Sequence, residues 1–93
     1  MSNIHVDPEK LRDFARVLKG YAALVEGSLA EVDGSLRRLG QTWCDQDFEV
    51  FASGVRQTRQ RLATFSVDAQ KAASMIDQDA DSIERFRKVR LPE

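Results

Sequence analysis

Apolar side chains recur every seven residues along the first half of the chain. The row consists of Leu11, Leu18, Val25, Val32 and Leu39, and it is flanked by Phe14, Tyr21, Leu29 and Leu36. Positions seven apart share one face of an α-helix, so the pattern predicts an amphipathic helix with a broad core-facing band. Asp7-Pro8-Glu9 is a typical helix start, because an N-cap Asp accepts free backbone N–H groups and Pro fits the first turn. The first helix is therefore predicted over about 8–39.

Glycine positions indicate where this helix ends and raise a question about one of its faces. Gly40 follows Leu39 where a left-handed C-cap residue is favoured, and Arg37 and Arg38 would then lie in the last turn, near the negative end of the helix dipole. Gly20, Gly27 and Gly34 also repeat every seven residues, about 200° around the helix from the Leu11 row. Each costs about 1 kcal/mol relative to Ala. Two interpretations stay open: surface glycines that the helix tolerates, or close approach of another backbone on that face.

The second half of the chain carries a longer repeat of the same kind. One row consists of Phe48, Val55, Leu62, Ala69, Ile76 and Ile83, and its companion of Phe51, Thr58, Phe65, Ala72, Asp79 and Phe86. This heptad pattern predicts a second helix over about 46–89. Acidic residues at its start and basic residues at its end both suit the helix dipole, so the basic end is expected to be a solvated face.

A short turn over about 40–45 joins the two predicted helices, which must therefore lie antiparallel. The predicted fold is an all-α, antiparallel two-helix hairpin forming a single domain over residues 1–93. The apolar members of the rows, from Leu11 to Leu39 and from Val55 to Ile83, are the predicted core and dimer seam. Each helix covers only one side of the other's apolar band, so a partner is expected. A two-fold dimer forming a four-helix bundle is the simplest solution, and a different hairpin would satisfy the same surface.

Composition narrows the function classes. The chain has 93 residues, of which 42% are apolar and 31% charged, and this is typical of one ordinary folded domain. A formal net charge of −1 provides no positive field to attract phosphates, so we expect no nucleic-acid partner. The polar start lacks the pattern of a signal peptide, and no apolar run approaches the roughly 18 residues of a membrane span. We expect a cytoplasmic protein, with any export using a route that needs no cleaved leader.

Candidate catalytic groups are few. His5 has no second ligand at a metal-binding spacing, which favours an exposed tail residue. Cys44 lies near the start of the second helix, where a thiolate is favoured, so a reactive or disulfide-forming thiol and a plain turn residue both remain open. The acidic residues around Asp79 could form a carboxylate cluster, but the longer helix is expected to overhang the shorter one there, which favours a solvated face. We expect no catalytic residue, no cofactor and no metal.

Three arginines of the predicted second helix could bind either phosphates or acidic side chains. Arg56, Arg59 and Arg61 occur together on the predicted helix without interleaved exposed aromatics. Phosphate or single-strand binding normally uses such aromatics as stacking platforms. We therefore expect these arginines to contact acidic residues of a neighbouring helix.

The turn carries a recognisable motif, Thr42-Trp43-Cys44-Asp45-Gln46-Asp47-Phe48-Glu49-Val50-Phe51. A Trp in a tight interhelical turn, with aromatics three and six residues after Asp45, resembles the WXG (Trp-x-Gly) superfamily of type VII secretion proteins. The resemblance implies antiparallel homodimers or heterodimers, export without a classical signal peptide, and association with a membrane FtsK/SpoIIIE-type ATPase or with larger toxins. It also implies that Trp43 is the turn Trp, and that Phe48 and Phe51 hold the second helix against the first.

Two features depart from that family. Asp45 replaces the Gly, as in a Trp-x-Asp variant, and it must either adopt a left-handed conformation or act as the N-cap of the second helix, which we favour. The export signal expected after the second helix, Tyr followed four residues later by Asp or Glu, is missing, since Tyr21 is the only tyrosine. Our main hypothesis is a non-enzymatic hairpin acting as secreted substrate, chaperone or adaptor in a type VII-like or toxin-associated system. The alternative is a cytosolic coiled-coil scaffold or regulator that binds a partner's helix.

Overall fold

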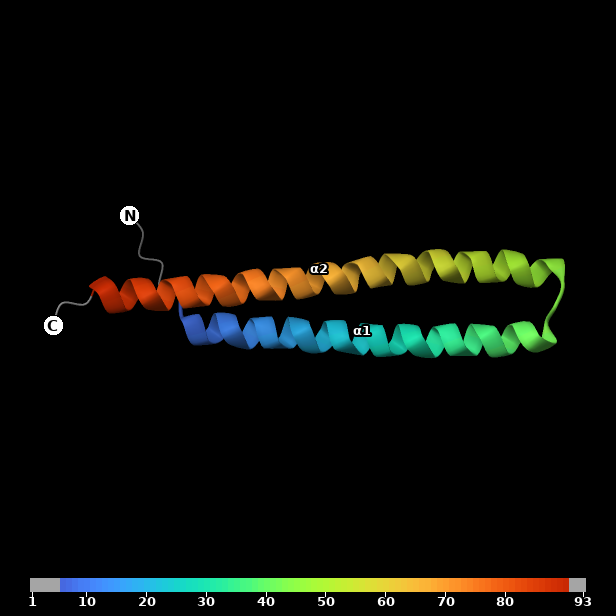
Figure 1. The fold of residues 1–93 in the computed structure, drawn as a ribbon, viewed down its shortest axis with the longest axis horizontal. Helices are drawn as coiled ribbons and strands as arrows, with labels where there is room; N and C mark the ends of the chain where they lie inside the picture. Colours follow the sequence, from blue (N-terminus) through green and yellow to red (C-terminus); the bar gives the residue numbers. More distant parts are fainter. Residues whose placement is uncertain (1–5, 91–93) are drawn as a thin grey trace.

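Two long helices make up the protein. The computed structural model describes residues 6–90, with the backbone alone for 88–90. Helix α1 (Pro8–Thr42) and helix α2 (Gln46–Arg90) lie side by side and antiparallel, joined by a turn at one end (Figure 1). The hairpin measures 74 × 23 × 14 Å. The predicted all-α, antiparallel two-helix hairpin is confirmed.

Helix α1 begins as its capping residues predict. Asp7 has an extended backbone, and its Oδ1 accepts a hydrogen bond from the Glu9 N–H at 2.9 Å. The Asp7 carbonyl accepts further bonds from the N–H groups of Lys10 and Leu11. These bonds satisfy N–H groups that have no partner within the helix, so the first turn is stable without tertiary contacts.

The end of α1 differs from the prediction. The helix continues through Gly40 to Thr42, and Gly40 does not have the positive φ of a left-handed cap. Trp43 is the C-cap instead, with an extended backbone and an N–H that donates to the Leu39 carbonyl at 2.9 Å. Gly40 has a packing role in place of a capping one: a Cβ there would lie 3.0 Å from Cζ of Phe48. Because the helix is longer, Arg37 lies outside the last turn, which contains no basic residue.

Small side chains form the contact between the helices. The buried residues at this contact repeat every seven positions, and they are Ala15, Ala22 and Leu29 of α1 and Ala52, Ser66, Ala73 and Ala80 of α2. Ser66 is fully buried, and its hydroxyl donates to the Ala22 carbonyl at 3.2 Å. Small residues let two helix backbones approach closely, so this central row sets the spacing of the hairpin.

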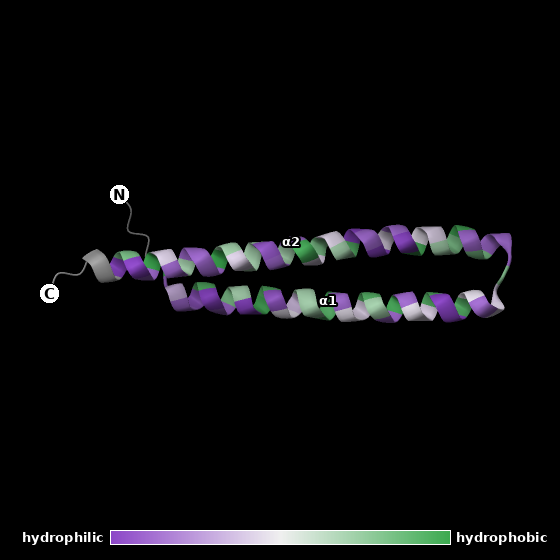
Figure 2. Cartoon of the chain, in the orientation of Figure 1, coloured by the Kyte–Doolittle hydropathy of each residue, from purple (hydrophilic) through white to green (hydrophobic). Residues whose placement is uncertain are grey.

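The larger apolar rows lie beside this contact rather than within it. Hydrophobic and hydrophilic positions alternate along the whole length of both helices (Figure 2). On each helix, one large apolar row (Leu18 or Val55) is displaced by three residues, about a sixth of a turn, from the central small row. The other row (Phe14 or Phe51) is displaced by one residue, a little over a quarter of a turn, in the same direction. The hairpin therefore has two unlike sides, one apolar and one charged.

Candidate protein-interaction surface

Three aromatic rings hold the corner of the hairpin. The ring centroids of Trp43 lie 5.5 Å from those of both Phe48 and Phe51, with Phe48 presented edge-on. Phe48 is only 8% exposed, because it also packs against Gly40. Such edge and tilted contacts are favourable beyond the area they bury. The aromatics of the turn motif thus lie together and attach the start of α2 to the end of α1.

Asp45 is the N-cap of α2, as predicted. Its Oδ1 accepts a hydrogen bond from the Phe48 N–H at 3.1 Å, and its carbonyl accepts from the same group at 3.2 Å. No described residue other than glycine has a positive φ, so Asp45 is not left-handed. The Asp therefore replaces the expected Gly of the motif by supplying a cap rather than by imitating a glycine conformation.

Cys44 is an exposed free thiol beside this cap. Its Sγ lies 3.1 Å from the Gly40 carbonyl oxygen and 3.7 Å from that of Gln41. Both carbonyls belong to the last turn of α1, where carbonyl oxygens have no helical N–H group that donates a hydrogen bond to them. The thiol contributes a weak donor to the helix end, and this geometry favours the interpretation as a turn residue.

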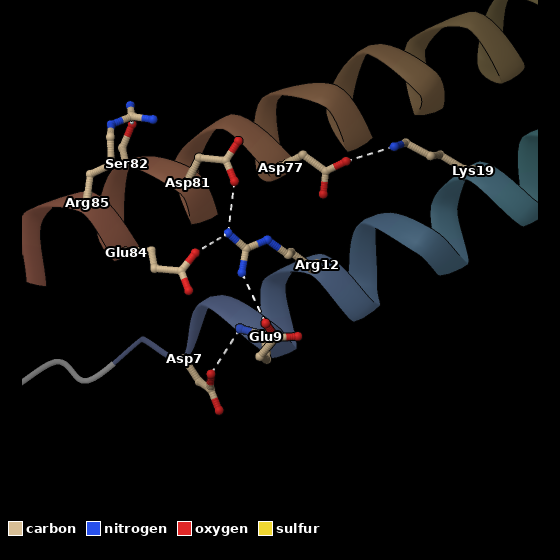
Figure 3. Close-up of polar contacts among 9 residues, drawn as sticks. All are labelled: Asp7, Glu9, Arg12, Lys19, Asp77, Asp81, Ser82, Glu84 and Arg85. Carbon is tan, nitrogen blue, oxygen red and sulfur yellow. Dashed lines mark hydrogen bonds and ion pairs between the residues drawn. The ribbon is translucent and has the colours of Figure 1, made fainter. Parts of the chain in front are cut away.

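One side of the hairpin is a row of interhelical ion pairs (Figure 3). The Arg12 guanidinium lies between two carboxylates of α2, 2.8 Å from Asp81 and 2.7 Å from Glu84, and it also contacts Glu9 at 3.2 Å. The hydrogen bonds that Arg12 donates to Asp81 and Glu84 raise the pKa of Arg12 above its ordinary value. Two turns further along α1, Lys19 pairs with Asp77 at 2.7 Å. These pairs join the beginning of α1 to the last third of α2.

The acidic residues of α2 are therefore not the solvated overhang that we expected. Asp77, Asp81 and Glu84 face cations of α1, and Ala80 in their midst is fully buried. Asp79 is exposed, but it lies in the part of α2 that α1 still covers. The spacing of Arg12 and Lys19, seven residues apart on α1, could have predicted these ion pairs, because both cations lie across the antiparallel contact from this acidic segment.

A bidentate pair lies on the same side near the turn. Arg59 donates to both carboxylate oxygens of Asp33, at 2.7 and 2.8 Å, as expected for an arginine that contacts a neighbouring helix. The hydrogen bond from Arg59 lowers the pKa of Asp33, and the charges of Arg59 and Arg37 act in the same direction. The same hydrogen bonds to Asp33 raise the pKa of Arg59. Two parallel N–H···O bonds define orientation as well as attraction, so this pair helps to specify how the helices align.

The opposite side of the hairpin, which we call the apolar face, carries the large hydrophobic residues of both helices. Leu29 and Ala69 are buried there, and the partly buried members are Leu11, Leu18, Val25, Leu36, Val55, Ala72, Ile76 and Ile83. The exposed members are Phe14, Tyr21, Val32, Leu39, Phe51, Leu62 and Phe65. A face this long and apolar is typical of a protein-binding surface.

The apolar face is hollowed near the turn and carries a pair of aromatic rings further along. A groove of about 530 Å³ is lined by Val32, Phe51 and Gly54 among others, and a neighbouring groove of about 400 Å³ extends to Leu39. In the other half, the rings of Tyr21 and Phe65 meet edge-on with centroids 6.1 Å apart. Both rings stay about half exposed, at 57% and 49%. Phe51, which lines the groove, is exposed to a similar degree, at 45%, so aromatic rings are available to a partner along both halves of the face.

The size of the exposed surface supports this interpretation. The chain exposes 7281 Å², whereas a compact protein of its mass exposes about 5,400 Å². Its radius of gyration is 21.1 Å, against about 12 Å for a compact domain of this length. The excess of about 1,900 Å² per chain is larger than the roughly 800 Å² that each partner loses in an interface of standard size.

Other classes of site find little support in the part of the chain that the structure describes. Within residues 6–87 no group of three or more His, Cys, Asp or Glu side chains is arranged to hold a metal ion. Neither α1 nor α2, as far as they are described, contains a segment apolar enough to cross a membrane. Gly20 and Gly27 face open space in the single chain. His5 lies outside the described residues.

Comparison with protein families decides the relationship. The family model for WXG100, proteins of 100 residues with WXG, matches residues 3–86. The chain belongs to the WXG100 family. No curated protein and no solved structure gave a match. As a WXG100 member, the chain is a helical hairpin protein associated with type VII secretion. Its tryptophan, Trp43, lies in a Trp-Cys-Asp turn.

Proposed function

We propose that this WXG100 hairpin is a non-enzymatic protein that dimerises through its apolar face and acts as a secreted substrate, chaperone or adaptor in a type VII-like or toxin-associated system. The observation that carries the proposal is the continuous apolar face of α1 and α2, which no part of the same chain covers among residues 6–87. A second helical hairpin is the partner that fits a long, flat and apolar surface of this kind.

The energetics favour a partner of similar size. Burying apolar surface contributes about 25 cal/mol per Å², and stable interfaces bury about 1,200–2,000 Å² in total. The charged side of the hairpin offers little to such a partner, because Arg12, Lys19, Asp33 and Arg59 are already paired with carboxylates or cations of the same chain. The interaction is thus directed to one side of the molecule.

The proposed cellular partners follow from the family. A related hairpin, or the helical domain of a larger toxin, would complete a four-helix bundle on the apolar face. An FtsK/SpoIIIE-type ATPase would recognise the assembled pair during export. The corner at Trp43, which is only partly buried in the single chain, lies at one end of the hairpin and is a position at which such a machine can bind.

Affinity purification of the tagged protein from its native cell tests this function. Phe65→Glu places a charge in the apolar face, and Val67→Glu places the same charge on the charged side of α2, where Val67 is 44% exposed. We expect wild type and Val67→Glu to retain a hairpin partner, identified by mass spectrometry, and Phe65→Glu to lose it. Immunoblots of culture medium from cells with and without the ATPase then separate an exported substrate from a retained chaperone or adaptor. A wild-type monomer that captures no helical partner would refute the proposal.

A further inference from the structure

One heptad row of α2 contains a glycine, an arginine, an aspartate and an exposed methionine. Gly54, Arg61, Asp68 and Met75 are spaced seven residues apart, directly beside the row of Phe51 and Phe65. Since Gly54 lines the groove together with Phe51, this row forms the outer edge of the apolar face. The central contact of α2 with α1 keeps the same seven-residue repeat, so the row holds its orientation along the hairpin.

The charged members of this row have no partner among the side chains that the structure describes. Neither Arg61 nor Asp68 makes an ion pair or side-chain hydrogen bond with any residue whose side chain the structure describes. Met75 is 64% exposed, and a Cβ built at Gly54 would meet no atom within 4 Å. By contrast, Arg12, Arg59 and Lys19 all pair across the hairpin. Residues left unpaired at the edge of an apolar face are the usual determinants of partner choice in helical bundles.

A two-fold axis across the hairpin pairs this row with itself. When two α2 helices pack antiparallel with Leu62 opposite the partner's Phe65, Phe51 lies opposite the partner's Ile76. In that register Arg61 lies beside the partner's Asp68, and Gly54 lies beside the partner's Met75. Two-fold symmetry forms each contact twice. The row is thus self-complementary both in charge and in shape.

We infer that the partner on the apolar face is a second copy of this chain, packed antiparallel with α2 against α2 in the register that pairs Arg61 with Asp68. The inference rests on the proposed dimer and specifies its partner and alignment. Met75 of each copy lies over Gly54 of the other, where the missing side chain leaves space. The same rotation brings the segment of one face that carries Tyr21 and Phe65 toward the grooved segment of the other.

The competing two-fold arrangement fits less well. If α1 of one copy packed against α2 of the other, both turns would lie at the same end of the bundle. Arg61 would then lie near the partner's Glu31, but Asp68 would face the partner's Leu24, where its charge would have no counterpart. Aromatic halves would also meet each other, and the grooves near both turns would stay unfilled. The antiparallel α2 pairing gives Arg61 and Asp68 partners of opposite charge, and it covers the groove near the turn of each copy.

Charge-reversal variants test the inference in solution. Arg61→Asp leaves two acidic groups in the row, and Asp68→Arg leaves two basic groups, so each variant places like charges at both contacts of its own dimer. We expect each to raise the dissociation constant on the order of tenfold, measured by light scattering and analytical ultracentrifugation. An equimolar mixture of the two variants restores both ion pairs and should dimerise as tightly as wild type. The double variant with both reversals in one chain should also recover.

Controls distinguish the register from the dimer itself. Arg16→Asp makes the same change in net charge away from the apolar face, where Arg16 contacts only Asp13, and it should leave the dissociation constant unchanged. If the wild type is a dimer but neither reversal weakens it, or the mixture is no tighter than the separate variants, the register is refuted while the dimer stands. Rescue of Arg61→Glu by Glu31→Arg would establish the competing arrangement instead. A monomeric wild type would refute the proposed function first.

Discussion

At the scale of single residues, Trp43 concentrates the stability of the corner. Its ring contacts both Phe48 and Phe51, so truncation removes the group that joins the two helices where they are furthest from other support. Because Trp43 is only partly buried, we expect Trp43→Ala to lower the free energy of unfolding by about 2–3 kcal/mol in denaturant titrations. Cys44→Ser keeps the donor to the Gly40 carbonyl and should change it by less than about 0.5 kcal/mol. Equal stability of the two variants would show that Trp43 does not hold the corner.

Asp45 offers a comparison between two ways of making the same turn. If its carboxylate acts as the N-cap of α2, Asp45→Ala should cost about 1 kcal/mol of unfolding free energy. Asp45→Gly restores the Trp-x-Gly form of the motif and should cost only about 0.3 kcal/mol, because glycine is an acceptable N-cap. Thermal unfolding followed by circular dichroism measures both. A loss for Gly as large as that for Ala would mean that the side chain does more than cap the helix.

The glycines of α1 differ in what surrounds them. Gly27 has no atom within 4 Å of a built Cβ, so Gly27→Ala should gain about 1 kcal/mol of helix propensity. Gly40→Ala should bring no such gain, because its Cβ would lie 3.0 Å from Cζ of Phe48 and the ring must move. Melting temperatures of the two variants provide the test. If Gly27→Ala is destabilising instead, another backbone approaches that face in the assembly.

At the scale of elements, the sequence predicts the two helices and their antiparallel order, but not the residues that join them. Caps such as Asp7 and Asp45 act locally, so their roles can be inferred from neighbours in the sequence. The contact row of Ala15, Ala22 and Ala73 carries a weak hydrophobic signal beside rows of Leu, Val and Phe. The prediction placed the contact between the helices at the large apolar residues, whereas close packing of two helices depends on small ones. Gly40 was misjudged for a related reason: its environment includes Phe48, which only the folded corner brings near.

The alignment of α1 on α2 should respond to acid through the Asp33–Arg59 pair. Arg59 lowers the pKa of Asp33 in the folded state below its ordinary value of 3.8, so in mild acid the unfolded chain binds a proton that the folded chain does not. The stabilisation is therefore present above the ordinary pKa and is lost as pH falls through the lowered one. Asp33→Asn should melt at a lower temperature at neutral pH and lose less stability on acidification than wild type.

A matched control for that experiment is Asp13→Asn, whose carboxylate pairs with Arg16 within α1 and not across the hairpin. Because this variant leaves the Asp33–Arg59 pair intact, the part of the acid loss that depends on that pair should remain over the range of about pH 6 to pH 2. Melting temperatures measured across that range give the slope for each variant. Identical slopes for Asp33→Asn and wild type would remove the bidentate pair as an acid-sensitive element.

At the scale of the whole molecule, elongation connects the helices to association. A hairpin of 74 Å length and 14 Å thickness has no interior beyond the single contact between α1 and α2. The contact is made largely of alanines and one serine, so each chain buries few large side chains on its own. Most of the hydrophobic stabilisation available to Phe14, Tyr21, Leu62 and Phe65 is realised only when a partner covers them. Folding and association are thus expected to be coupled.

That coupling predicts a melting temperature that depends on protein concentration. Mass action stabilises a folded dimer as the chain concentration rises, and a hundredfold increase is equivalent to about 2.7 kcal/mol at 25 °C. We expect the wild type to melt several degrees higher at roughly 100 μM than at roughly 1 μM, in calorimetry or circular dichroism. Phe65→Glu should melt lower and show almost no dependence on concentration, whereas Val67→Glu should behave as the wild type does. A melting temperature that stays constant over this range for the wild type would mean that the hairpin is stable alone, with its apolar face exposed.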